Sequence, residues 1–296
     1  MKFTKMHGNG NDFIVIENMA KNNSLFLNKE ELSEMAIKLC NRKTSIGADG
    51  VLVVEEHQTP PNDKRCDFRM RLFNADGSEA EMCGNGARCI AKYAFRNKIC
   101  GVNAAFSTPA GIMRAVINEN SGKVDLDMGR IMLPGGVSCQ RMTARGIELD
   151  YVFLTVGVPH CVIFADNMDL SDRARLFSLG REIRNDAVRF PKGANVNFTK
   201  KTDGDIWNIT YERGVEDLTE SCGTGSVAAA IAMECIRGES SPLKIRNLGG
   251  INEVTLKFDF EKDECNAALN GDAIAAFTGE IEYGPHIDQK RRHPKR

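Results

Sequence analysis

The chain lacks an excess of charge of either sign. Its 296 residues carry 39 Lys and Arg against 40 Asp and Glu, which gives a formal net charge of −1. A nearly neutral chain has no general attraction for nucleic acid or for an anionic membrane surface. Long apolar runs are missing too, and the first residues, MKFTKMHGNGNDF, lack the apolar core of a secretory leader. We therefore expect a cytoplasmic protein with neither a nucleic acid nor a membrane as partner.

Histidine is also scarce, which bears on metal binding. The chain has 5 His in all, and the pair Cys83 and Cys89 has no C-x2-C or H-x3-5-H partner nearby. The 10 cysteines could instead form a disulfide framework. They are spread over a long chain without a secretory signal, however, and this favours reduced thiols. We predict no metal and no disulfides.

The most informative pattern is a repeat. MCGNGARC (82–89) and SCGTGSVA (221–228) each place a Cys directly before Gly-x-Gly, and each then runs into an apolar helix. A cysteine at a helix N-terminus lies among unpaired backbone N–H groups, which favour the thiolate and lower the thiol pKa. Two such thiols in matching halves predict a base and an acid on opposite faces of one carbon, with the N–H groups free to bind a carboxylate. The chemistry that fits is inversion at the α-carbon of an amino acid.

Hydrophobic periodicity predicts two α/β halves. Strands are expected at 12–17, 50–55, 68–73, 152–156, 161–164 and 206–211, and helices at 29–40, 87–96, 170–184 and 226–236. The last helix, SVAAAIAMECI, has almost no polar face and must be enclosed. We therefore expect strands around it in a barrel or a strongly curved sheet.

The second glycine motif has an alternative interpretation as a nucleotide site, since Gly223-x-Gly225-x-x-Ala228 loosely matches a dinucleotide-binding fingerprint. That fingerprint needs a strand that ends directly at the first glycine. The predicted strand 206–211 ends well before it, and the intervening segment is polar. The duplicated cysteine is the stronger pattern and favours proton transfer.

The motifs together resemble the diaminopimelate epimerase family, enzymes that interconvert L,L- and meso-diaminopimelate in lysine and cell-wall precursor synthesis. The likeness covers almost the full length: KMHGNGNDF (5–13), IGADGVL (46–52), FNADGSEAEMCGNGARC (73–89), GVPHCV (157–162), NVNF (195–198) and YERGVEDLTESCGTG (211–225). The resemblance implies a homodimer of two-domain subunits, an α+β fold in which each domain is a barrel-like sheet around a central helix. It further implies an active site in the cleft between the domains, an amino-acid substrate, and neither PLP nor a metal as cofactor.

The resemblance assigns Cys83 and Cys222 as the acid/base thiols. One, as thiolate, removes the α-proton while the other, as thiol, protonates the opposite face; the reverse reaction exchanges the roles. Without PLP as electron sink, the site itself must stabilise the carbanion. Four backbone N–H groups would bind the carboxylate and neutralise its developing charge: those of Gly84, Asn85, Gly223 and Thr224.

Other side chains match substrate-contacting positions of the family. His160 and Glu212 match positions that orient the α-amino group and tune the thiols, and Asn11 matches a contact near the reacting end. Three residues match the distal end, where an arginine can clamp a carboxylate: Asn74, Asn195 and Arg213. Each alone has a structural alternative, such as a core histidine, a turn-forming asparagine or a surface ion pair.

Two positions depart from the family pattern and bear on the substrate. Val158 stands where the family commonly has Asn before Pro-His, and Gly50 stands where some members carry Gln. Neither touches the thiols. Diaminopimelate is the favoured substrate, while a racemase of another amino acid and a non-catalytic amino-acid-binding protein stay open as alternatives.

The predicted domain organisation has a break near 121–125. The first domain comprises residues 1–125 plus 272–283 and carries Cys83, and the second comprises 126–271 and carries Cys222. The last residues, 284–296, form a basic tail that we expect to be disordered.

Overall fold

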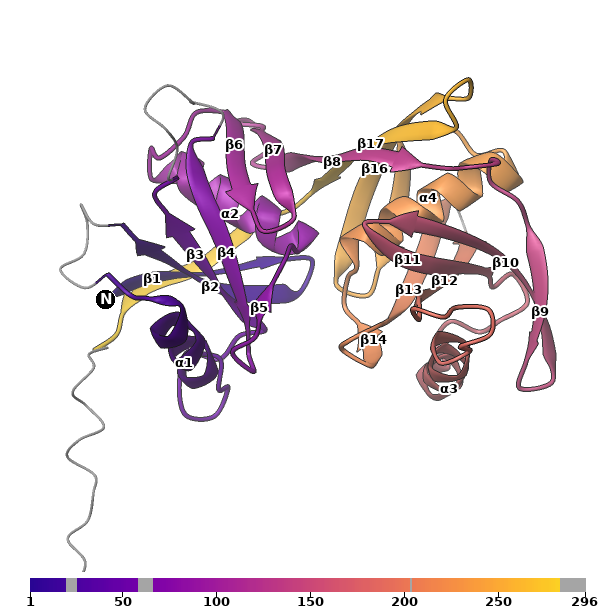
Figure 1. Cartoon of the computed structure of the whole chain (residues 1–296), viewed down its shortest axis with the longest axis horizontal. Helices are drawn as coiled ribbons and strands as arrows, with labels where there is room; N and C mark the ends of the chain where they lie inside the picture. Colours follow the sequence, from indigo (N-terminus) through magenta and orange to yellow (C-terminus); the bar gives the residue numbers. More distant parts are fainter. Residues whose placement is uncertain (20–25, 58–65, 203, 283–296) are drawn as a thin grey trace, which may run out of the picture.

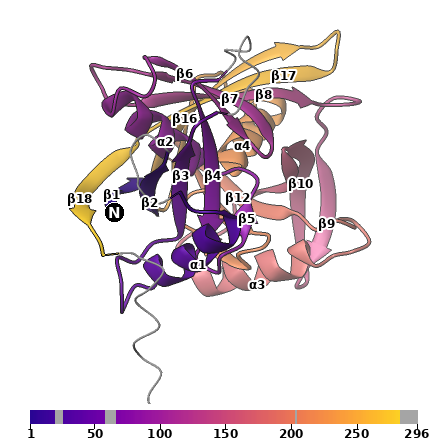
Figure 2. The ribbon, with the colours of Figure 1, turned by 60° about the vertical axis from the view of Figure 1, so that its left-hand side comes forward.

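The chain folds into two α/β halves joined by two long strands (Figure 1). In this computed structural model the described residues are 1–19, 26–57, 66–202 and 204–282. The joining strands, β8 (Val124–Met132) and β17 (Glu264–Gly271), pair antiparallel and run through both halves. The predicted α/β fold class is confirmed, but the strands of both halves form one continuous 18-stranded sheet, which curves around one central helix in each half (Figure 2).

Every helix and strand expected from periodicity is present, with ends that differ by a few residues. The first half contains β1 (Lys2–Gly8), β2 (Asn11–Asn18), α1 (Lys29–Leu39), β3 (Gly50–Glu55), β4 (Phe68–Asn74), β5 (Glu79–Ala80), α2 (Gly84–Arg96), β6 (Asn103–Thr108) and β7 (Gly111–Ile117). The second contains β9 (Gln140–Ala144), β10 (Ile147–Val156), β11 (Val158–Phe164), α3 (Arg173–Arg184), β12 (Asn195–Thr202), β13 (Asp205–Glu212), β14 (Asp217–Thr219), α4 (Gly223–Arg237), β15 (Leu243–Asn247) and β16 (Gly250–Asp259). The chain then returns through β18 (Ile274–Glu280) to pair with β1.

The two halves repeat one order of strand pairing. In the first, β2 pairs parallel with β3 and β4 pairs parallel with β6. In the second, β11 pairs parallel with β12 and β13 with β15. Parallel neighbours need a crossover, which α1 and α2 provide in the first half and α3 and α4 in the second. The duplication seen in the two cysteine motifs therefore extends to the topology.

The central helices α2 and α4 form the two main cores. The α2 core includes Phe13, Leu52 and Phe106 from the surrounding strands, and the α4 core includes Val152, Ile245 and Val254. From Gly223 to Met233 every residue of α4 except Thr224 is buried. Enclosure of the apolar helix by strands is thus confirmed, as expected for a helix without a polar face.

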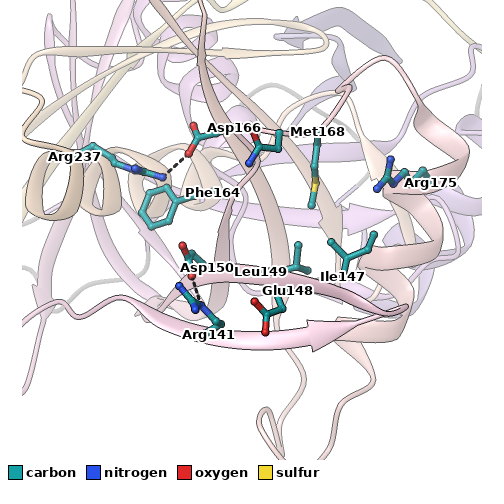
Figure 3. Close-up of a pocket in the computed structure, with 11 residues that line it drawn as sticks. Arg141, Ile147, Glu148, Leu149, Asp150, Phe164, Asp166, Met168, Arg175 and Arg237 are labelled. Atoms are coloured by element: carbon teal, nitrogen blue, oxygen red, sulfur yellow. Dashed lines mark hydrogen bonds and ion pairs between the residues drawn. The ribbon is translucent and has the colours of Figure 1, made fainter.

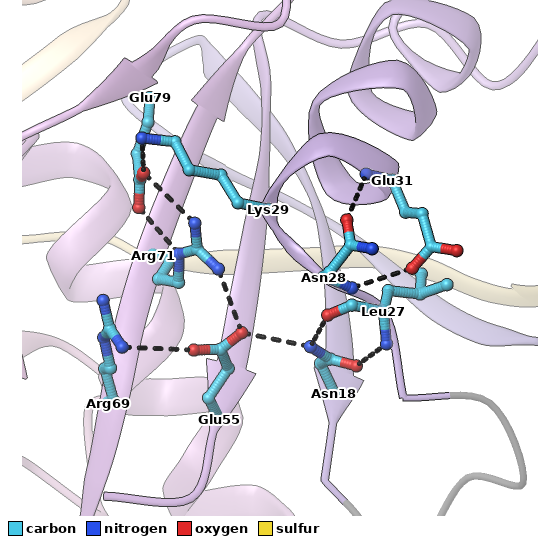
Figure 4. A network of polar contacts seen from close by, with 9 residues as sticks. All are labelled: Asn18, Leu27, Asn28, Lys29, Glu31, Glu55, Arg69, Arg71 and Glu79. Atoms are coloured by element: carbon cyan, nitrogen blue, oxygen red, sulfur yellow. Dashed lines mark hydrogen bonds and ion pairs between the residues drawn. The ribbon is translucent and has the colours of Figure 1, made fainter. Parts of the chain in front are cut away.

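A buried ion network stabilises the first half near the loop that leads to Cys83 (Figure 4). Arg71 on β4 donates from Nε to Glu79 Oε1 at 2.7 Å and lies 3.4 Å from Glu55 Oε1. Lys29 at the start of α1 also contacts Glu79, at 3.1 Å. Since β5 ends three residues before Cys83, these contacts hold the start of the cysteine loop in place.

The predicted domain division between residues 125 and 126 falls within β8. Val124 and Leu126 pack in the α2 core, whereas Ile131 packs in the α4 core. The division stays a prediction, and both residue 283 and the predicted tail 284–296 lie outside the described residues. Among the described helices, none is long and apolar enough to cross a bilayer.

Candidate active site

The two Cys-Gly-x-Gly motifs meet at the starts of α2 and α4. Cys83 is the N-cap residue of α2 and Cys222 that of α4. The helix starts touch through glycines: a Cβ placed on Gly223 would lie 3.7 Å from the Cα of Gly84. The free N–H groups of two helix N-termini are thereby brought to one place, which is a geometry suited to an anion.

The Cys83 thiol faces an amide whose orientation is set by a carboxylate. Cys83 Sγ donates to Asn11 Oδ1 at 3.5 Å, and Asn11 Nδ2 donates to Asp49 Oδ2 at 2.8 Å. Asp49 is in turn paired with Arg42 at 2.8 Å. Because a carboxylate can only accept from Asn11, the amide oxygen must point toward the thiol.

The Cys222 thiol lies at the first turn of α4. Its Sγ accepts from the backbone N–H of Gly225 at 3.4 Å and lies 3.5 Å from Thr224 Oγ1. Gly225 allows this close packing, since a Cβ there would collide with Asn197 Oδ1 and lie 3.0 Å from Thr210 Oγ1. The second glycine of the motif is thus required by the strands behind it.

Burial raises the pKa of both thiols, contrary to the lowering expected from the helix termini. For Cys83 the loss of hydration outweighs the backbone N–H groups of Asn85 and Gly86, and the Glu212 carboxylate raises the pKa further. Burial and the Glu212 carboxylate raise the pKa of Cys222 in the same way. The prediction was wrong because the loss of hydration on burial outweighs the stabilisation that the helix end still gives each thiolate. Both thiols therefore hold their protons at neutral pH in this arrangement.

Glu212 is the carboxylate common to the two thiols. It ends β13, and burial raises its own pKa. A carboxylate in this position acts on Cys83 and Cys222 together, which couples the protonation of all three groups.

His160 is completely buried on β11. Its Nδ1 accepts from Asn197 Nδ2 at 3.0 Å, and that amide is fixed by Thr210, which donates to Asn197 Oδ1 at 2.9 Å. The ring proton is therefore on Nε2, a buried donor without a partner among the described residues. Burial, together with the nearby Arg213 charge, lowers the pKa of His160 to about 3. The imidazole is neutral and can only donate from the free nitrogen.

The three residues predicted to bind the distal end of the substrate lie in two groups. Asn195 Oδ1 accepts from the backbone N–H of Arg213 at 2.8 Å, and the Arg213 guanidinium donates to Lys192 O at 2.7 Å. Asn74 donates to Ser78 Oγ at 3.0 Å within its own turn. Asn195 and Arg213 are thus joined, while the Asn74 side chain is engaged locally.

The two departures from the family pattern have different surroundings. Gly50 lies directly opposite Asn74 in the β3–β4 pairing, and a Cβ on it would lie 2.8 Å from the carbonyl oxygen of Phe73. The backbone therefore leaves no room for a side chain at this position. Val158 begins β11 and is half-buried, two residues before His160.

Sequence reasoning missed three residues that set the geometry of the site: Asp49, Arg88 and Asn197. They lie within the recognised motifs IGADGVL, GNGARC and NVNF, and that position was the available signal. Their residue types alone do not indicate that they orient Asn11, Asn85 and His160. Asp49 and Asn197 contact segments far apart in the chain, and the Arg88–Asn85 contact within α2 matters only because Asn85 reaches Ser221 in the other half.

A cavity of about 240 Å³ on the second half is not part of this site (Figure 3). Two of the three arginines that line it, Arg141 and Arg237, are paired with Asp150 and Asp166. None of the predicted site residues lines it. Within the described ranges, no three His, Cys, Asp or Glu side chains are grouped to hold a metal ion.

Several solved structures share this fold. A PhzF-family phenazine biosynthesis protein from Bacillus anthracis superposes with a TM-score of 0.69 at 15% identity, over 95% of this chain and 98% of that one. A hydroxyproline epimerase from Agrobacterium vitis gives a TM-score of 0.66 at 16% identity, over 94% of this chain and 91% of that one. At 15–16% identity these structures show the fold, which this chain shares with an epimerase and a phenazine biosynthesis protein.

Sequence comparisons narrow the class to one family. The diaminopimelate epimerase family model matches residues 3–133 and 152–274. The diaminopimelate epimerase of Aquifex aeolicus is 36% identical over 284 residues, 95% of this chain and 98% of that protein. The diaminopimelate epimerase of Methanocella arvoryzae is 37% identical over 292 residues, which are 95% of this chain and 97% of that protein. The chain belongs to the diaminopimelate epimerase family and is an isomerase.

Proposed function

We propose that the protein interconverts L,L- and meso-diaminopimelate by cofactor-independent proton transfer between two cysteines. The observation that carries the proposal is the meeting of Cys83 and Cys222 at two helix N-termini that touch through Gly84 and Gly223. The thiols lie on different helices from different halves, as removal and delivery of a proton on opposite faces of one carbon require.

The proton balance follows from the protonation of the thiols. Since burial keeps both cysteines protonated, one of them must first release its proton to solvent before the cycle begins. The thiolate then takes the α-proton on one face, and the other S–H gives its proton to the opposite face. Backbone N–H groups at the helix starts bind the carboxylate as it gains negative charge: those of Gly84, Asn85, Gly223 and Thr224.

His160 and Glu212 take complementary parts in the proposal. The neutral His160 offers an Nε2–H donor, so it suits the carboxylate or a thiolate and cannot accept from an α-ammonium group. Glu212 is the acceptor available for that ammonium group, and Asn11 orients Cys83. Arg213, held by Asn195, binds the distal carboxylate, with Asn74 as the third distal contact.

The wider role that we propose follows family membership. The enzyme would act in the cytoplasm as a homodimer, in lysine and peptidoglycan precursor synthesis, with its domains divided at residues 125 and 271. The half-buried Val158 is the position at which a substrate with a different distal end would be accommodated.

Proton NMR in D2O tests the proposal. Incubation of L,L-diaminopimelate with the reduced protein should remove the α-proton signal while the meso isomer forms. A panel of other amino acids run in parallel separates the alternatives. Exchange of another amino acid alone would make the protein a racemase of different specificity, and binding without any exchange would support the binding-protein alternative.

Replacing Glu212 by Gln should separate thiol reactivity from turnover. Loss of the negative charge beside Cys83 and Cys222 lowers the pKa of both, so both thiols should be alkylated faster at pH 8. Epimerisation should fall about a hundredfold, because the ammonium group loses the negatively charged carboxylate that pairs with it. Mass spectrometry of the two cysteine peptides and the NMR assay measure the two effects. Slower alkylation, or unchanged turnover, would contradict the role of Glu212.

A further inference from the structure

Arg88 is a fully buried arginine on α2, one turn after the residues that begin the helix. Its Nη2 donates to Asn85 Oδ1 at 2.7 Å. Nε and Nη1 have no hydrogen-bond partner within the described part of the chain. Gly271 makes room for the guanidinium, since a Cβ there would lie 3.0 Å from Arg88 Cζ and Nε.

The Arg88 charge has no direct carboxylate partner among the residues that the structure describes, and Asp272 acts on it only at longer range. A buried cation without an anion is costly. By contrast, the buried Arg71 contacts two carboxylates. The isolation of Arg88 points to an anion that exists in only part of the reaction.

Asn85 connects Arg88 to both cysteine loops. Its Nδ2 donates to the carbonyl oxygen of Ser221, the residue before Cys222, at 3.0 Å. The same Nδ2 lies 3.4 Å from Asn11 Oδ1, which accepts from Cys83. Since Arg88 can only donate, its bond to Oδ1 directs the amide nitrogen of Asn85 toward the second half. One continuous chain of hydrogen bonds thus runs from the guanidinium to both loops.

We propose that Arg88 is a positioning residue, which fixes the Asn85 amide between the two cysteine loops and supplies the counter-charge for the Cys83 thiolate. The proposal rests on the proposed function, in which Cys83 alternates between thiol and thiolate. The charged and titratable groups that act on or with Cys83 are one cation, one carboxylate and two thiols: Arg88, Glu212, Cys89 and Cys222. Arg88 is the one among them that favours the anion.

Arg88→Met and Arg88→Lys test the two parts of the proposal in the full-length protein. For Arg88→Met, iodoacetamide should alkylate Cys83 about tenfold more slowly at pH 8, equivalent to a rise of about one pKa unit. The kcat should fall at least about tenfold, with KM within about threefold. Arg88→Lys should retain Cys83 alkylation because it keeps the charge, yet it should lose kcat because it lacks the planar fork that binds Asn85.

Lys92→Met is the matched control, because Lys92 is a half-buried cation one turn further along α2 that contacts Gly122 O. It should alter neither Cys83 alkylation nor kcat. Wild-type alkylation and kcat in Arg88→Met would overturn the proposal. If that variant does not fold, unchanged kcat in Arg88→Lys overturns the positioning role. Alkylation of Cys83 does not depend on turnover. If the protein does not act on diaminopimelate but Arg88→Met still slows Cys83 alkylation as expected, only the proposed function is contradicted.

Discussion

Replacing either Cys83 or Cys222 by alanine should lower kcat/KM at least about a thousandfold in both directions. Each direction needs one thiolate to take the α-proton and one thiol to deliver the new proton. Loss of either cysteine therefore impairs both directions of the reaction. Backbone N–H groups at Gly84 and Gly223 do not depend on the side chains and should keep substrate binding largely intact. The α-proton NMR assay, started from each isomer, together with calorimetric binding, measures both effects.

Cys235→Ala is the matched control for this experiment. Cys235 lies on α4, the helix that Cys222 caps, but its side chain is exposed at the other end of the helix. Activity should stay within about twofold of the wild type, since surface substitutions seldom disturb a fold. A Cys83→Ala or Cys222→Ala variant that keeps a tenth of the wild-type activity would rule out proton transfer by two thiols.

Replacing Arg71 by Met should lower the free energy of unfolding by about 3–5 kcal/mol. The substitution keeps the volume but leaves Glu55 and Glu79 without the cation that lies between them (Figure 4). Breaking one partner of a buried ion network is costly because the remaining charge keeps its desolvation penalty. Urea denaturation at pH 7 measures the loss.

The pH dependence of this loss has a definite sign. Hydrogen bonding to Arg71 holds the pKa of Glu79 below its ordinary value of 4.5, so the contribution of Glu79 is present above that value and disappears as the pH falls below it. The difference in the free energy of unfolding between the wild type and Arg71→Met should therefore become smaller below pH 4.5. Arg69→Met is the control: Arg69 is only half-buried and lies 3.8 Å from Glu55, so its loss should cost less than about 1 kcal/mol. Equal losses in both variants would contradict the buried network.

Local patterns were sufficient to predict the elements and the candidate thiols. Alternation and helical periodicity are properties of neighbouring residues, so the strand at 50–55 and the helix at 29–40 were predicted within one residue of their observed ends. The apolar sequence of α4 required enclosure, and the repeat of Cys-Gly-x-Gly indicated two matching helix starts. Strand order, register and the joining of the halves by β8 and β17 depend on pairings between distant segments, which periodicity does not encode.

The sequence by itself thus determined which cysteines begin which helices, that α4 is buried, and, through its motifs, the family. Only the tertiary structure decided the electrostatics of the site. Burial reversed the expected lowering of the thiol pKa values, and Asn197 placed the His160 proton on Nε2. Arg88 and Asn85 joined the two cysteine loops across the halves. The physical reason is that hydration and hydrogen-bond partners depend on which distant residues surround a group, whereas helix and strand patterns depend on its neighbours in the chain.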